Sequence, residues 1–92
     1  MDSNAVSVPN PFDLGRAIRG HRKARDMTQA QLADAAGVSA KWLSEVENGK
    51  ATAEVGKIMG VLGCLGHTLS VAPRRGPLLD LGAHIDSFAQ DP

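Results

Sequence analysis

Residues 28–49 read TQAQLADAAGVSAKWLSEVENG and predict two short helices joined by a tight turn. Thr28 can cap the first helix through its hydroxyl group, and Gln31 three residues later completes a capping box. Gly37 ends this helix, because glycine tolerates the positive φ that a sharp turn requires. Ser39 can then cap the second helix. The predicted unit is a helix, a glycine turn and a second helix.

Apolar residues recur at helical spacing in both segments, so each helix has one face to bury. Val38 lies between the helices and is expected to fill the angle that they form. Two such helices joined by a glycine turn form a helix-turn-helix unit. The residues expected on the buried faces are Leu32, Ala33, Ala36, Leu43 and Val46.

The spacing of this unit resembles the Xre/Cro-type family of phage and bacterial repressors. That family has Thr-Gln, Leu-Ala, Gly-Val-Ser, an aliphatic-Ser pair and Glu-Asn-Gly in the same order. The resemblance implies a mainly α, lambda-repressor-like domain of four to five helices that binds double-stranded DNA. The matching residues are Thr28, Gln29, Leu32, Ala33, Gly37, Val38, Ser39, Leu43, Ser44, Glu47, Asn48 and Gly49.

In a helix-turn-helix protein the second helix enters the major groove, with its N-terminal residues nearest the bases. Lys41 can donate to guanine O6 and N7, Ala40 can touch a thymine methyl group, and a serine can bond to base or phosphate. Trp42 is interpreted as a half-buried anchor, with direct DNA contact as the alternative. The residues expected nearest the bases are Ser39, Ala40, Lys41, Ser44 and Glu45.

The resemblance also assigns roles at the two ends of the unit. It implies that Gln29 holds a phosphate at the start of the first helix, and that Asn48 and Lys50 do so at the far end. It further implies a structural ion pair between Arg22 and Glu47. If that pair forms, Arg22 is not free to bind DNA.

The composition fits one small domain but does not by itself indicate a DNA-binding protein. The chain has 92 residues and a formal net charge of zero. A basic run without intervening acids precedes the unit; it is either a solvated helix face or, beside a helix-turn-helix, partly a phosphate-facing stripe. The run consists of Arg16, Arg19, Arg22, Lys23 and Arg25.

Enzyme chemistry finds no support in the sequence, and we expect no cofactor and no metal. The three histidines lack metal-ligand spacing with Cys64, the single cysteine. Glu45 and Glu47 lie two residues apart on a helix and therefore point to different faces. A lone cysteine, no signal peptide and no apolar run of membrane-spanning length together predict a cytoplasmic protein.

Outside the central unit, helical patterns predict one helix on each side. The first begins near Phe12 or Asp13 and ends around Arg25. The last is expected to be capped by Thr52, and glycines on it leave a smooth surface for close approach of another helix. Residues 1–11 are interpreted as a flexible arm and residues 12–66 as the DNA-binding domain. The apolar positions of the last helix are Val55, Ile58, Met59, Leu62 and Leu65, and its glycines are Gly56, Gly60 and Gly63.

Residues 67–73 change to an alternating pattern that predicts a strand, with Leu69 and Val71 on one face. A lone strand needs a partner for its backbone groups. The same strand of a second copy would supply one across a two-fold axis and make a homodimer; pairing with residues 6–8 is the alternative.

Residues 74–92 form a predicted tail. Large apolar residues are spaced to line one face of a short helix, which would pack on its own dimer or dock on a partner; plain disorder is the third interpretation. These apolar residues are Leu78, Leu81, Ile85 and Phe88.

A helix-turn-helix, one further helix and a short strand together resemble the antitoxins of the Hip toxin–antitoxin family, in which the strand joins two subunits. The resemblance implies a repressor that binds an inverted-repeat operator, autoregulates its operon and binds a kinase-type toxin. A stand-alone repressor is the alternative within DNA binding. A protein-interaction module with secondary DNA binding is the alternative from another class.

Overall fold

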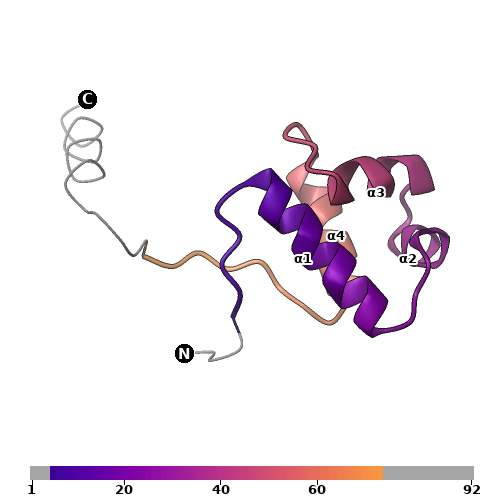
Figure 1. The fold of residues 1–92 in the computed structure, drawn as a ribbon, viewed down its shortest axis with the longest axis horizontal. Coiled ribbons are helices and arrows are strands. Elements are labelled where there is room, and N and C mark those ends of the chain that lie inside the picture. Colours follow the sequence, from indigo (N-terminus) through magenta and orange to yellow (C-terminus); the bar gives the residue numbers. More distant parts are fainter. Residues whose placement is uncertain (1–4, 74–92) are drawn as a thin grey trace.

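The computed structural model describes residues 5–73 and consists of four helices (Figure 1). They are α1, Pro11–Ala24; α2, Gln29–Ala36; α3, Ala40–Glu47; and α4, Val55–Cys64. Helix α3 packs against α1 and α2, and α2 also packs against α4. The predicted mainly α fold is therefore confirmed. A fifth helix would fall in the tail, outside the described residues.

The local signals act as the sequence predicts. Thr28 Oγ1 accepts a hydrogen bond from the Gln31 amide at 3.0 Å, and Gln31 Oε1 accepts one from the Thr28 amide at 2.9 Å. These two bonds complete the capping box. Gly37 takes a φ of 71° in the turn, and Ser39 Oγ accepts from the Trp42 amide at 3.0 Å. The helix-turn-helix geometry is thus fixed by short-range bonds.

The first helix begins slightly earlier than the pattern suggests. Asn10 is its cap: Oδ1 of Asn10 accepts a hydrogen bond from the Asp13 amide at 2.8 Å. Pro11 then occupies the first turn, where its missing N–H costs nothing. Asp13 suits the positive end of the helix.

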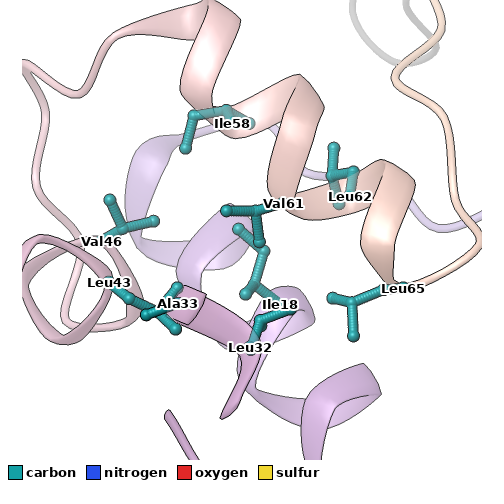
Figure 2. Close-up of a cluster of buried hydrophobic side chains, with 9 residues drawn as sticks. All are labelled: Ile18, Leu32, Ala33, Leu43, Val46, Ile58, Val61, Leu62 and Leu65. Carbon is teal, nitrogen blue, oxygen red and sulfur yellow. The ribbon is translucent and has the colours of Figure 1, made fainter. Parts of the chain in front are cut away.

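One hydrophobic core joins all four helices (Figure 2). Ile18 of α1 points into the centre, where Val61 of α4 meets it. Each such side chain contributes roughly 1.5–3 kcal/mol relative to its exposed state. The buried apolar residues are Ile18, Leu32, Ala33, Leu43, Val46, Ile58, Val61, Leu62 and Leu65.

Helix α4 corrects two expectations. Glu54, not Thr52, is the residue at its N-cap, and its side chain makes no capping bond. Val55 and Met59 are 62% and 53% exposed, whereas Val61 is fully buried. The helix is apolar on several sides, so spacing alone does not show which side faces the core.

The outward side of α4 is apolar and unusually smooth. We name it the open face; it comprises Val55, Gly56, Met59, Gly60 and Gly63. A Cβ built on any of its three glycines would meet no atom within 4 Å.

Residues 67–73 form neither a helix nor a strand in this single chain. His67 opens the segment, and its ring lies against that of His21 on α1, with 3.9 Å between the centroids. Burial, the His67 ring and the Arg25 charge lower the pKa of His21. No backbone hydrogen bond links the segment to residues 5–10, so the alternative pairing with the arm is not formed there. Pairing with a second copy stays a prediction.

The remaining predictions on the termini concern residues 1–4 and 74–92, which lie outside the described residues. The apolar tail residues Leu78, Leu81, Ile85 and Phe88 are among them. Within residues 5–73, every helix is too short or too polar to cross a lipid bilayer.

Candidate DNA-binding surface

The N-terminal end of α3 projects from the domain. Leu43 and Val46 are buried and hold the helix on the core, so its opposite side faces outward. Ser39, Ala40 and Lys41 are exposed at this end. Ser44 and Glu45, one turn further on, are half-buried. The structure therefore places Ser39, Ala40 and Lys41 together at the exposed N-terminal end of α3, and the other two residues expected near the bases further along the same helix.

Lys41 is the free cation of this surface. The ion pairs of residues 5–73 are Arg22–Glu47, Lys50–Glu45 and Lys57–Glu54, and Lys41 takes part in none of them. An exposed, unpaired ammonium group at the start of α3 can donate three hydrogen bonds to acceptors outside the chain.

Trp42 follows Lys41 on α3 and is partly covered by the domain. It is half-buried and packs against the hydrophobic core. The Lys57 ammonium group lies 5.6 Å from the centroid of its ring, within range of a cation–π interaction. This position fits the interpretation of Trp42 as a half-buried anchor.

A buried ion pair ties α1 to the end of α3. Nε of Arg22 lies 2.8 Å from Glu47 Oε2, and its Nη2 lies 3.0 Å from Oε1, so the guanidinium group binds the carboxylate with two parallel bonds. Nη1 of Arg22 also donates to the Met27 carbonyl oxygen at 2.8 Å. All three guanidinium nitrogens of Arg22 thus donate a hydrogen bond inside the domain, and the ion pair with Glu47 that the resemblance implies is present.

Gln29 joins the same network. Its Nε2 donates to Glu47 Oε1 at 3.0 Å, so one carboxylate links α1, α2 and α3. Burial alone would raise the pKa of Glu47, but the hydrogen bonds from Arg22 and Gln29, with the charges of Arg22 and Arg19, lower it overall. Gln29 therefore has a structural partner besides its expected phosphate.

The far end of α3 carries the remaining predicted contacts. Nζ of Lys50 lies 3.1 Å from Glu45 Oε1, so these two predicted DNA-binding residues neutralise each other. Asn48 is exposed, and its Nδ2 donates to the Ser44 carbonyl oxygen at 2.9 Å. Gly49 follows with a φ of 97° and turns the chain away.

Gly15 is a positioning residue that the sequence interpretation missed. A Cβ at this position would overlap the Val46 carbonyl oxygen and lie 2.9 Å from that of Glu47. Helix α1 therefore touches the backbone of α3 with no side chain between them. The available signal was a glycine inside a helical pattern, which often has a packing reason.

Comparison with known proteins finds a matching family and a similar protein sequence. The family described as helix-turn-helix domain matches residues 13–69. A protein of Sinorhizobium fredii named an uncharacterized HTH-type transcriptional regulator, y4mF, is 36% identical over 67 residues, which are 73% of this chain and 88% of that protein.

Two solved structures share the fold, the HipB-O4 20mer complex and the HipA-HipB-O2-O3 complex. In each, the matching chain superposes with a TM-score of 0.71 at 20% identity. The match covers 77% of this chain and 100% of the other.

Proposed function

The chain belongs to the helix-turn-helix domain family and is a DNA-binding regulator of that kind, and from this premise we propose that it is a homodimeric, sequence-specific repressor acting in the cytoplasm. Each subunit places α3 in the major groove of one half-site of an inverted repeat, about one helical turn from the other. The observation that carries the proposal is the exposed N-terminal end of α3 with its unpaired Lys41.

Lys41→Ala is expected to lose operator binding while the chain stays folded and keeps its oligomeric state. One good contact to a base edge discriminates by about 1–3 kcal/mol, so affinity should fall ~5- to 150-fold per half-site. The operator is first selected by the native chain from a random duplex library. Fluorescence anisotropy then measures both proteins on the selected duplex.

Arg25→Ala is the matched control for that experiment, since Arg25 is an exposed cation at the end of α1, beside Gly66. It should bind like the native chain. A Lys41→Ala variant with native affinity would show that the base-reading residues are wrongly assigned. Failure of the native chain to select any duplex sequence would refute the repressor itself.

Exposed apolar surface supports the homodimer. The open face of α4 adjoins a hollow whose lining includes Val8, Leu14 and Leu69. Val71, two residues further on, is fully exposed. A second copy would cover this surface and supply the backbone partner that residues 67–73 lack.

The full-length chain is expected to have the mass of a dimer in solution, and a chain ending at Gly66 that of a monomer. Leu69→Lys with Val71→Lys should also give monomers, because two charges would enter the interface. The matched control, Thr68→Lys with Ser70→Lys, alters the other face of the strand and should stay dimeric. A monomeric native chain in light scattering would exclude the intermolecular strand.

We also propose that the repressor is the antitoxin of a toxin–antitoxin operon and binds a Hip-type kinase toxin. The shared fold with HipB supports this, and one of the two HipB structures also contains HipA. Co-expression with a kinase-like neighbouring gene should yield a stable complex. A neighbourhood without such a gene favours the stand-alone repressor; a salt-insensitive protein complex without DNA binding favours the interaction module.

A further inference from the structure

Three cations form a stripe along the exposed side of α1. Arg16, Arg19 and Lys23 follow one another at i, i+3 and i+7, so they lie on one face of the helix. All three are exposed, and none belongs to an ion pair of residues 5–73. At 1.5 Å per residue the stripe is about 10 Å long.

The stripe borders a shallow hollow between α1 and the end of α3. Its lining consists of Phe12, Arg16, Arg19, Gly20, Lys23, Glu47 and Asn48. The Arg16 guanidinium group lies 5.7 Å from the centroid of the Phe12 ring, which limits its freedom. Gly20 adds no side chain to the floor. The hollow is therefore open to solvent and lined by hydrogen-bond donors.

The charge of this hollow is positive although the whole chain is neutral. Glu47 is its one acid, and the Arg22 guanidinium group already binds that carboxylate inside the domain. Three unpaired cations remain. A surface of this kind attracts an extended anion, and arginine forks match phosphate oxygens in particular.

We propose that this hollow binds the phosphate backbone of DNA flanking the half-site that α3 enters, an inference that rests on the proposed function. Asn48 is common to the hollow and to the end of α3, so a strand held there continues onto the α1 stripe. DNA carries one phosphate per strand about every 3.4 Å along its axis, so a stripe of this length can meet two to three of them. These contacts position the protein without reading sequence.

The test is the salt dependence of DNA binding by the full chain. Each phosphate contact adds about 0.9 to the slope of log affinity against log salt concentration. Arg16→Gln with Arg19→Gln and Lys23→Gln should lower that slope by about 2 to 3 per subunit. Affinity near 0.1 M salt should fall ~10- to 100-fold. The order of preference among duplex sequences should not change.

Two controls separate this proposal from the proposed function. Arg25→Gln removes one cation from the same helix away from the hollow, and its slope should equal that of the native chain. Lys41→Ala should lose sequence preference but keep the α1 contribution to the slope on random duplexes. Thermal unfolding followed by circular dichroism checks that each variant is folded.

The outcomes are distinct. A triple variant with the native salt slope and the native affinity would overturn the proposal without contradicting the repressor function. The positive charge of the hollow would then fit an acidic protein surface as its partner. A native chain without sequence preference, whose slope nevertheless falls in the triple variant, would uphold the hollow as a phosphate site and refute the repressor. A lower slope with unchanged preference supports both.

Discussion

Gly15→Ala is expected to lower the free energy of unfolding by about 2 kcal/mol or more, although alanine is the better helix former. In an exposed helix interior this exchange favours the folded state by roughly 0.8–1 kcal/mol. Here the added methyl group would overlap the Val46 carbonyl oxygen and crowd that of Glu47. Both are backbone atoms that cannot rotate away, so α1 and α3 must separate.

The same separation should weaken DNA binding. Helix α1 supports the C-terminal end of α3, and a shift there tilts the N-terminal end that carries Lys41. We expect the folded Gly15→Ala variant to bind the selected operator at least ~10-fold less tightly than the native chain, in line with the loss of one base contact. Urea denaturation gives the stability, and anisotropy in the absence of urea gives the affinity.

Gly20→Ala is the matched control, because Gly20 lies on the same helix five residues further along. A Cβ there would meet no atom within 4 Å, so only the helix propensity changes. The stability of this variant should rise by roughly 0.5–1 kcal/mol. Two alanine variants of equal stability would show that α1 and α3 do not approach as closely as described.

Features controlled by neighbours in the sequence were predicted correctly. The capping box at Thr28, the positive φ of Gly37 and the cap at Ser39 all depend on groups within three or four residues. Such short-range bonds leave a direct signature in the residue types. The helix-turn-helix could therefore be derived before any tertiary contact was known.

The orientation of α4 could not be derived in the same way. Val55, Met59 and Val61 are all apolar, and glycines fill much of the remaining surface of the helix. Only packing against α2 and the core places Val61 inward and leaves Met59 outside. The three glycines of the open face do not indicate, from the sequence alone, which side of α4 is exposed.

The candidate site shows the same division. The caps that define α3 placed Ala40 and Lys41 at its N-terminal end, where the structure shows both exposed. The pairing of Lys50 with Glu45 and of Gln29 with Glu47 depends on the three-dimensional fold, so residue types alone did not reveal it. A residue expected to hold a phosphate can thus also have a structural role.

Breaking the buried ion pair is expected to be the most damaging change to stability. Arg22→Met or Glu47→Leu should each cost about 3–5 kcal/mol, because either leaves a charge buried without its partner. The side chains of Arg22 and Glu47 are only 9% and 2% exposed, so water cannot replace the lost partner. The total free energy of unfolding of a small domain is only about 5–15 kcal/mol. Equilibrium urea denaturation measures each loss.

The acid side of the stability profile should change with Glu47. Its pKa in the folded chain lies below the ordinary value of 4.5, so its contribution is fully present above that value. It is lost as the pH falls through the lower folded pKa. The Glu47→Leu variant should therefore be less stable than the native chain at neutral pH. Its free energy of unfolding should fall less steeply than that of the native chain as the pH drops below 4.5. An equally steep decline would show that other carboxyl groups control acid unfolding.

The double variant Arg22→Met with Glu47→Leu separates the contribution of the ion pair to stability from its contribution to the orientation of α3. It leaves no buried charge, and apolar replacements of similar volume often restore or exceed native stability. We expect stability within about 2 kcal/mol of the native chain, hence a large favourable coupling between the two substitutions in a double-mutant cycle.

The operator affinity of this double variant then shows whether the ion pair orients α3. The two parallel bonds fix the angle between α1 and α3, and Gln29 ties α2 to the same carboxylate. Apolar side chains would fill the space without fixing that angle. Native-like stability with affinity at least ~10-fold weaker, about the effect of one lost base contact, would show that the pair orients α3. Native affinity would instead mean that Gly15 and the core alone set its direction.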